Sequence, residues 1–396
     1  MTMKLYKFRP FEITKENYSD SFIPGERSGH RICCDDINLY SFGGYNFKEN
    51  DDSHNLYKEI LCYNFVTKRW KLINDDDISD DGMSDEDIPD ELASSSMLIY
   101  GKTLVIFGGT SYPFGLRCSN TITLIKTDQP FRINELKTYN DEVNQPPQQY
   151  GMSIVCKNNY LYTLGGTQGF DYTADLFRLD LKNHKWELLA ISRPEIDPIQ
   201  PIGRYRHEIA IDSRYIYIFG GGTADQVFDL KELPVYDLFE RKWNRVDTYP
   251  NADDEYPKPR KCHSLVQHTL KDVNGEEETF VYIVGGNNHS GPLNDVWRFS
   301  LKTRQWFCFK KAGLRTTLYF HDAAITSDGC MYIFGGITST AQRTNNLYKM
   351  WVTIPKLSAI AWESLLHYYP FIHKASKKFI LEKGVPLHFA NRVHPN

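Results

Sequence analysis

The sequence has no long apolar run and no excess of basic residues. No apolar stretch approaches the roughly 20 residues of a membrane-spanning helix. The first residues, MTMKLYKFRPFEI, lack the apolar core of a signal peptide. Lysine and arginine total 46 against 50 acidic residues, and the net charge of −4 gives no basic footprint for nucleic acid. We therefore expect no membrane and no nucleic acid among the partners, and a cytoplasmic or nuclear location, or both.

The familiar motifs of enzymes and metal sites are also missing. The eight cysteines form no C-x-x-C pair, and no H-E-x-x-H, G-x-S-x-G or P-loop sequence occurs. The twelve histidines are scattered along the chain, and a copper oxidase would need a Tyr, Cys and His constellation of ligands. We expect a non-catalytic protein with no cofactor and no bound metal, whose thiols are reduced and mostly buried.

Aromatic residues are abundant, and one pattern is repeated. Tyrosine, phenylalanine and tryptophan make up 14% of the chain, which suits a β-rich fold. An apolar run that ends in two glycines occurs six times: LYSFGG, LVIFGG, LYTLGG, IYIFGG, VYIVGG and MYIFGG, with first glycines at 43, 108, 165, 220, 285 and 335. The intervals of 50 to 65 residues between these glycines indicate six repeats, each large enough for one propeller blade.

Two further signals accompany the glycine pairs. A tyrosine, leucine or phenylalanine precedes a tryptophan by seven residues at Tyr63 and Trp70, Leu179 and Trp186, Tyr236 and Trp243, and Phe299 and Trp306, and Leu124 and Phe131 have this spacing in the second repeat. An Arg-x-x-His sequence precedes the glycines at Arg27, Arg204 and Arg260, while His321 lacks its arginine. The combination resembles the kelch repeat. It predicts an all-β, six-bladed kelch β-propeller over residues 1–353.

The sixth repeat offers only three strands, around His321, at 331–334 and at 346–353. We expect the aromatic stretch Lys4–Ile13 to supply its fourth strand and so to join the two ends of the ring. The long first interval contains 74–91, with ten acidic residues in eighteen. This acidic loop is either a solubilising insert or, at Ser84, a phosphorylation site. The second long interval holds Lys271–Glu278, which we expect at a hairpin tip.

Residues 354–396 form a tail with a different pattern. Pro355 suits a helix start, and Pro370 ends that helix. Two apolar stripes lie side by side on it, one with Leu357, Ile360, Ala361, Leu365 and Tyr368, the other with Trp362, Leu366 and Tyr369. A second helix is expected at about 373–383, ending at Gly384. Either the first helix only packs on the propeller, or one stripe packs and the other binds a partner.

Particular segments resemble one kelch family. They are RSGHR (27–31), FGGYN (42–46), FGGTSYPFG (107–115), RYRHEIA (204–210), FGGGT (219–223), CHS (262–264), YFHDAAIT (319–326) and GCMYI (329–333), with AWESLL (361–366) and YPFI (369–372) in the tail. The chain resembles the kelch-domain substrate receptors of cullin-2 ubiquitin ligases. That resemblance implies a tail that binds elongin C through Leu357, Ile360, Ala361 and Leu365. It also implies that a segment contacting cullin-2 begins at Pro370, and that elongin B and the RING subunit of cullin-2 are further partners.

The resemblance also implies a binding site on one propeller face, built from the loops after the second strands and between blades. In this family that face binds client C-termini, whose carboxylate often follows glycine or another small residue. The residues of these loops are Arg27, Ser28, Tyr45, Tyr112, Tyr150, Gln168, Arg204, Tyr205, Arg206, Thr223, Arg260, Lys261, Tyr319 and Phe320. Arg206 and Arg260 are the expected carboxylate ligands, with Ser28 or Thr223 as neutral donors.

Two alternatives stay open. An arginine or histidine of the Arg-x-x-His pattern can form hydrogen bonds between blades and have no contact with a ligand. The whole chain can also be a non-catalytic scaffold for cytoskeletal or signalling partners, with a tail that only packs on the propeller. Binding of elongin B and C separates the receptor from the scaffold.

Overall fold

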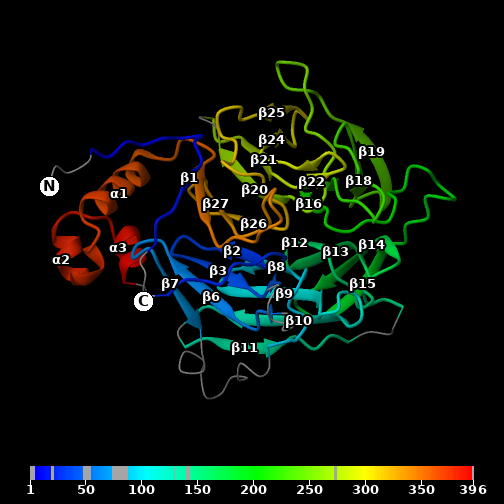
Figure 1. The fold of residues 1–396 in the computed structure, drawn as a ribbon, viewed down its shortest axis with the longest axis horizontal. Helices are drawn as coiled ribbons and strands as arrows, with labels where there is room; N and C mark the ends of the chain where they lie inside the picture. The colour runs from blue at the N-terminus through cyan, green and yellow to red at the C-terminus, as the bar shows by residue number, and fades with distance from the viewer. Residues whose placement is uncertain are drawn as a thin grey trace.

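A computed structural model describes residues 5–18, 22–47, 55–73, 88–128, 130–139, 143–271 and 274–394. Six four-stranded antiparallel sheets follow one another along the chain and form the blades of a closed ring (Figure 1). The predicted all-β, six-bladed propeller is therefore confirmed. Ser84 and most of the acidic segment 74–91 lie outside the described residues.

The first three blades each use four consecutive segments of chain. Blade one has β2 (Arg31–Cys34), β3 (Asn38–Phe42), β6 (Ile60–Asn64) and β7 (Arg69–Ile73), with a small hairpin of β4 (Tyr45–Asn46) and β5 (Asn55–Leu56). Blade two has β8 (Ser96–Tyr100), β9 (Thr103–Thr110), β10 (Cys118–Lys126) and β11 (Arg132–Glu135). Blade three has β12 (Ser153–Lys157), β13 (Tyr160–Thr167), β14 (Tyr172–Asp180) and β15 (Lys185–Ala190).

The last three blades repeat this order. Blade four has β16 (Glu208–Ile211), β17 (Tyr215–Phe219), β18 (Glu232–Asp237) and β19 (Lys242–Asp247). Blade five has β20 (Ser264–Lys271), β21 (Glu277–Val284), β24 (Val296–Ser300) and β25 (Trp306–Cys308), with a small hairpin of β22 (Asn287–Asn288) and β23 (Gly291–Pro292). Blade six has β26 (Asp322–Ile325), β27 (Cys330–Phe334), β28 (Leu347–Trp351) and β1 (Thr14–Lys15). The β20–β21 connection confirms the hairpin tip expected within Lys271–Glu278.

The N-terminal segment closes the ring at blade six. Strand β1 pairs antiparallel with β28, so the first described strand lies beside the last one of the propeller. The prediction of an N-terminal fourth strand is confirmed, but its bounds of Lys4–Ile13 were wrong. A turn at residues 10 and 11 precedes the strand, where Pro10 lacks an N–H and Phe11 has a φ of 62°. The ladder therefore forms only at Thr14–Lys15.

Five of the six glycine pairs lie against a histidine, and the three pairs of blades four, five and six lie against two. A Cβ on Gly165 would lie 2.6 Å from Cε1 of His207 in the next blade, and one on Gly221 would lie 2.5 Å from Cβ of the same histidine. The pair therefore leaves room for a buried imidazole between blades. Burial lowers the pKa of His30, His207, His263 and His321. These rings are neutral spacers, which explains why Gly-Gly and Arg-x-x-His occur together.

The fourth strands carry the predicted tryptophans. Tyr63 is opposite Trp70 in the β6–β7 ladder, and Leu179 is opposite Trp186 in β14–β15. In blade two the seven-residue spacing misplaced the pair. Leu124 is opposite Asn134, and the equivalent buried pair is Ile125 with Ile133. The longer connection in that blade moved the register by one residue, which exchanges the two faces of a strand.

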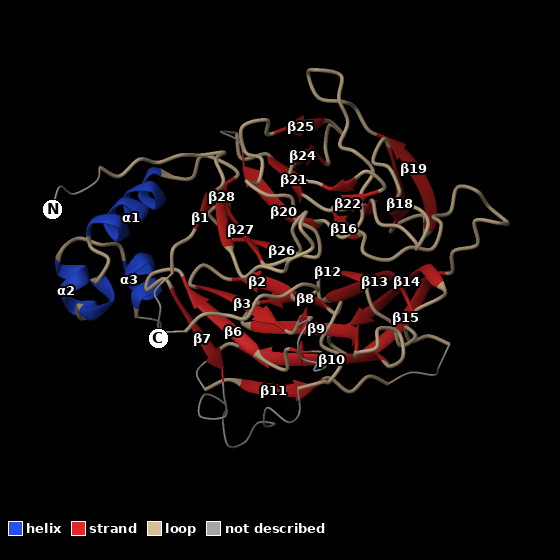
Figure 2. Ribbon diagram, in the orientation of Figure 1, coloured by secondary structure: helices blue, strands red, loops and turns tan. Residues whose placement is uncertain are grey.

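The tail forms short helices at one side of the ring, next to blades six and one (Figure 2). They are α1 (Leu357–Tyr368), the 3₁₀ turn η3 (Ile372–Lys374), α2 (Lys377–Glu382) and α3 (Leu387–Val393). The first predicted helix is confirmed. The second is shorter than 373–383 because Ser376 caps its N-terminus, where its side chain accepts from the N–H of Phe379. Helix α3 was not predicted. Among the described residues, no helix is long and apolar enough to cross a bilayer.

Candidate functional site

Six residues, one from each blade, form a closed ring of backbone hydrogen bonds. Each N–H donates to the carbonyl of the preceding member at 2.8–3.0 Å, and all six residues have φ between 53° and 69°. The members of this axial ring are Gly29, Ser94, Gly151, Arg206, Cys262 and Phe320. Such φ values suit glycine and disfavour other residues by roughly 1–2 kcal/mol each. Four strained non-glycine residues in one ring point to function here.

A pocket of about 180 Å³ lies on the axial ring, on the propeller face that carries the glycine pairs. Residues from five of the six blades contribute to its wall. They are Ser28, Gly29, Tyr45, Ala93, Ser94, Phe114, Tyr150, Tyr205, Arg206, Phe320, Ile337 and Arg343. Among the described residues, this axial pocket is lined by two arginines, several aromatic rings and no acidic side chain.

Arg206 provides one of the two positive charges. It is 6% exposed, its Nη2 donates to Oγ of Ser94, and its guanidinium lies 4.6 Å from the centre of the Phe320 ring. Its buried Nε has no hydrogen-bond partner among the described residues. Burial, and then the neighbouring charge of Arg31, lowers the pKa of Arg206. A buried cation without an acidic partner is costly unless an anion joins it, so Arg206 is a strong candidate for anion binding.

Arg343 provides the second charge, from the loop between β27 and β28. Its Nε donates to Oγ of Ser28 at 3.0 Å, and its guanidinium lies 4.7 Å from the centre of the Tyr45 ring. Partial burial lowers its pKa. Sequence reasoning missed this residue. Its position could have identified it, because Arg343 lies in the loop after the sixth glycine pair. The equivalent loops of the other blades carry several of the predicted site residues.

The structure brings six of the predicted residues to the pocket wall: Ser28, Tyr45, Tyr150, Tyr205, Arg206 and Phe320. Two others contact rings of the wall, because Tyr112 stacks on Tyr45 at 5.7 Å and Tyr319 lies 5.5 Å from the Phe320 ring. Gln168, Thr223 and Lys261 are outside the pocket wall. Gln168 is exposed, and Lys261 donates to the carbonyl of Thr223 at 2.6 Å.

The three arginines of the Arg-x-x-His pattern, Arg27, Arg204 and Arg260, are outside the pocket wall and share one arrangement. Each Nε donates to the carbonyl two residues earlier, and each Nη1 donates to the carbonyl of the first glycine of its own blade. Arg260 is fully buried and forms a bidentate pair with Asp295 at 2.7 and 2.8 Å. This placement gives the three side chains a structural role. The expectation that Arg260 binds the carboxylate therefore finds no support in the geometry.

A buried charge network joins the first strands of three blades. Arg31 of blade one lies 2.8 Å from Glu208 of blade four and 3.3 Å from Asp322 of blade six. Oγ of Ser153 also donates to Glu208, at 3.0 Å. Burial raises the pKa of Asp322 to about 6, although Arg31 opposes that rise. The sequence analysis did not find this network, because its members are far apart along the chain.

The tail presents a second candidate surface on α1. Ala359, Trp362 and Leu366 are buried against the propeller and α3, where Trp362 stacks on Phe389 at 5.0 Å. Leu357 is 79% exposed. Ala361 is exposed too, whereas Ile360 and Leu365 are half-buried. The predicted stripe with Trp362 and Leu366 packs on the molecule, although its third member Tyr369 is 64% exposed. The other, outward stripe is exposed at Leu357 and Ala361 and half-buried at its remaining three positions.

Pro370 lines an apolar groove of about 540 Å³ next to that outward stripe. Tyr368 and Leu365 from α1 and Phe379 and Ile380 from α2 also line it. Phe379 is 51% exposed, so the groove is accessible from outside. The outward stripe and the groove form one continuous apolar surface through their shared residue Leu365.

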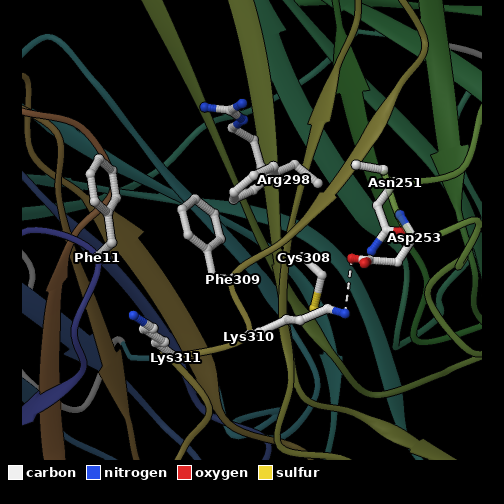
Figure 3. Close-up of a pocket in the computed structure, with 10 residues that line it drawn as sticks. Phe11, Asn251, Asp253, Arg298, Cys308, Phe309, Lys310 and Lys311 are labelled. Carbon is white, nitrogen blue, oxygen red and sulfur yellow. Dashed lines mark hydrogen bonds and ion pairs between the residues drawn. The ribbon is translucent and has the colours of Figure 1, made fainter.

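A separate hollow of about 440 Å³ lies beside blade five (Figure 3). Phe11 and Phe309 stack at 5.8 Å on one side of it, and Arg298 lies nearby. Lys310 on its wall is paired with Asp253 at 2.9 Å. Because an acid lines this hollow and neutralises one of its cations, it is a weaker candidate for binding an anion than the axial pocket.

A closed ring of six Gly-Gly blades, with its site over the axis on the glycine face, defines a kelch-repeat β-propeller protein. Comparison with known proteins gives the same class. The family model "KLHDC2/KLHL20/DRC7 Kelch-repeats domain" matches residues 12–187 and 83–273, and "Attractin/LZTR1 beta-propeller" matches residues 191–370. The chain belongs to the family of kelch domain-containing protein 10.

Curated relatives support this assignment over nearly the whole chain. The kelch domain-containing protein 10 homolog of Drosophila melanogaster is 40% identical over 99% of this chain and 66% of its own length. Kelch domain-containing protein 10 of Xenopus laevis is 36% identical, covering 93% of this chain and 86% of its own. The Homo sapiens protein is 35% identical, covering 91% and 78%. The chain thus spans just under two thirds of the fly relative and more of the vertebrate ones.

Proposed function

We propose that this protein is the substrate-recognition subunit of a cullin-2 ubiquitin ligase. The axial pocket binds the C-terminal carboxylate of client proteins, and α1 binds elongin C, which brings elongin B, cullin-2 and its RING subunit. The observation that carries the proposal is the pair Arg206 and Arg343, two guanidiniums without an acidic partner among the described residues, in an aromatic pocket.

The chemistry of the pocket suits a chain terminus. A free carboxylate accepts charge-assisted hydrogen bonds, which are about twice as strong as neutral ones. The unpartnered Nε of Arg206 and the hydroxyl of Ser28 are donors within the same pocket. A volume of about 180 Å³ is below that of sites for drug-sized ligands. A terminal residue with a small side chain, such as glycine, fits such a space, and a bulky one clashes with the tyrosine rings.

The exposed stripe of α1 supports the second half of the proposal. An apolar helix face that is not needed for packing is the form in which helices enter a partner's groove. Leu357 and Ala361 lie at i and i+4 on that face, followed by Leu365. The tail contacts the hairpin ends of blades one and six, since Arg392 pairs with Asp328 in the β26–β27 turn at 2.7 Å. The pocket is on the opposite, glycine-bearing face, so a client and a ligase subunit can bind together.

Paired peptides test the pocket. We expect a peptide that ends in glycine with a free carboxylate to bind at least tenfold more tightly than its C-terminal amide, measured by fluorescence anisotropy. Arg343→Ala should remove most of that difference. Arg214→Ala is the matched control, because Arg214 is paired with Asp237 at the hairpin end of blade four. Equal affinity for the acid and amide forms would refute recognition of the carboxylate.

Co-purification tests the tail. The wild-type protein should retain elongin B and C, and Leu357→Arg should lose them while keeping its melting temperature. Leu387→Arg is the matched control, because Leu387 is also an exposed tail leucine, at 58%, but lies on α3. If a folded wild-type protein does not retain elongin B and C, the chain is a kelch scaffold for cytoskeletal or signalling partners.

A further inference from the structure

Four apolar side chains are exposed together on the glycine-bearing face. Tyr112, Phe114 and Leu116 come from the β9–β10 loop and are 38%, 46% and 79% exposed, and Phe170 from the β13–β14 loop is 96% exposed. Large apolar side chains that stay exposed in one place indicate a surface that a partner covers. We call this group the apolar crest.

Two glycines bring the loops of the crest together. A Cβ on Gly115 would lie 3.0 Å from Cα of Gly169, so the two backbones are in close contact. Leu116 and Phe170 follow these glycines directly, so their side chains start from two backbone segments that lie side by side. The crest is therefore one surface formed by blades two and three.

Internal hydrogen bonds hold both loops in shape. In both of these loops the residue after the glycine pair is a threonine, Thr110 in blade two and Thr167 in blade three. Oγ1 of Thr110 accepts from the N–H of Gly115 at 2.9 Å, and Oγ1 of Thr167 accepts from the N–H of Gly169 at 3.0 Å. The loops are thus built to present their apolar side chains outward, and a preformed surface binds at lower entropic cost.

The crest is continuous with the axial pocket. Phe114 lines the pocket and is also part of the crest. Its ring contacts Tyr45 of the pocket wall at 5.0 Å and Tyr112 of the crest at 5.5 Å. Consecutive residues of an extended chain are about 3.3 Å apart. A chain that ends in the pocket therefore reaches the crest within its last few residues.

The corresponding loops on the other side of the pocket have a different character. Blade four presents Thr223, Asp225 and Gln226, blade five presents Asn288 and Ser290, and blade six presents Thr338, Thr340 and Gln342. Polar side chains of these loops bond within the loops themselves, at Thr223, Asn288, Thr338 and Thr340. An apolar chain thus finds a matching surface over blades two and three rather than over blades four to six.

We propose that the apolar crest binds apolar side chains of the client a few residues before its C-terminal carboxylate, so that the client leaves the pocket over blades two and three. This inference rests on the proposed function and adds the second requirement that a client must meet. A client then has a small terminal residue with a free carboxylate and leucine, phenylalanine or a similar residue between about the third and the sixth position from its end.

Four synthetic peptides test the proposal on the full chain. All end in the same two residues, the last one glycine. Positions three to six from the end are either leucine and phenylalanine or serine and asparagine, and each peptide is made as acid and amide. We expect the apolar acid to bind about tenfold more tightly than the polar acid. The double variant L116S/F170S should abolish that preference and leave the affinity for the polar acid unchanged.

The controls separate the crest from the pocket. Phe239→Ser removes another well-exposed aromatic ring, 75% exposed, from the β18–β19 hairpin and should behave as wild type. If the acids bind better than the amides but the wild-type protein does not prefer the apolar acid, the crest proposal is overturned and the pocket stands. An apolar preference that survives in L116S/F170S overturns it too. Equal binding of acids and amides, or no binding, overturns both.

Discussion

At the scale of single residues, the repeated glycines and arginines hold the blades in place, and their irregular neighbours bear the candidate function. The first glycine of a pair has φ near 60° and lies against a carbonyl or an imidazole of the next blade. The arginine of each Arg-x-x-His sequence bonds back to the carbonyl of that glycine. Arg206 and Arg343 lie outside this regular pattern. Departure from the repeat therefore marks the residues that are free to bind a ligand.

Gly43 and Gly101 offer a matched test of the glycine argument. Their φ values are 64° and 61°, but a Cβ on Gly43 would lie 2.3 Å from the carbonyl oxygen of Leu92, and one on Gly101 would meet nothing within 4 Å. Gly101→Ala should therefore lower the free energy of unfolding by about 1 kcal/mol, from backbone strain alone. Gly43→Ala should cost at least about 2 kcal/mol more. Chemical denaturation measures both, and equal losses would contradict the steric explanation.

Arg260→Lys tests the structural assignment of the regular arginines. Lysine cannot reproduce the bidentate contact with Asp295 or the bonds to the carbonyls of Lys258 and Gly285. The free energy of unfolding should fall by about 2–4 kcal/mol, because the half-buried Asp295 carboxylate loses its bidentate partner and two buried carbonyls lose their donors. Below the melting temperature, the affinity of the variant for an acid peptide should stay within about twofold of wild type. Arg117→Lys is the stability control, because Arg117 forms an exposed ion pair with Asp90. A selective loss of peptide binding would instead show that Arg260 contributes to the binding site.

At the scale of elements, the sequence predicted what depends on local pattern. Six apolar runs before glycine pairs give the second strands, and the Trp spacing gives most of the fourth strands. The prediction failed where a contact joins distant segments. The short helix α3 and the place of Arg343 depend on such contacts. The bounds of β1 and the register of blade two depend instead on the turn at residues 10 and 11 and on the longer β10–β11 connection. Eight of the fourteen predicted loop residues line the axial pocket or contact a ring of its wall, because equivalent loops of a propeller converge on one face.

Strand β1 connects three elements and should contribute measurably to stability. Its neighbour Glu16 is 6% exposed and lies 3.3 Å from Lys349 of β28 and 3.1 Å from Lys68. Lys349 also lies 2.9 Å from Glu363 of α1. The N-terminal segment, blade six and the tail thus share one buried charge cluster.

Deletion of residues 1–16 should therefore lower the melting temperature by about 5 °C or more, because β28 becomes an edge strand and Lys349 loses Glu16. Differential scanning calorimetry measures the change. Deletion of residues 1–4 is the control, since it leaves β1 and Glu16 in place. Similar melting temperatures for the two deletions would show that β1 does not close the ring.

At the scale of the whole molecule, three separate sets of contacts close the ring. Strand β1 joins β28 at the outside, the axial ring of backbone hydrogen bonds joins all six blades, and Arg31 joins Glu208 and Asp322 across the centre. The central charges are separated by 177 and 291 residues, so only the closed propeller brings them together. Two carboxylates share one guanidinium there, and burial raises the pKa of Asp322 to about 6. The closed ring therefore contains a titrating group at its centre.

The pH dependence of stability reports on this network. The pKa of Asp322 is higher in the folded protein than its ordinary value of 3.8, so the folded state binds the proton more tightly. The contribution of Asp322 to stability is therefore greatest at low pH and declines as pH rises to about 6. Relative to Asp322→Asn, which cannot titrate, the wild-type protein should lose about 1 kcal/mol of unfolding free energy between pH 5 and pH 7.

Urea denaturation of both proteins across that range measures the difference, and taking the difference cancels the groups that titrate equally in both. Asp225→Asn, at an exposed loop on the pocket face, should follow the wild-type curve. The opposite result is that the wild-type protein gains stability relative to Asp322→Asn as pH rises. It would mean that the attraction of Arg31 has a larger effect on the pKa of Asp322 than burial and Glu208, and that this pKa is lowered in the folded protein. In that case the network would stabilise the closed ring as an ordinary ion pair, with most of its effect already present at neutral pH.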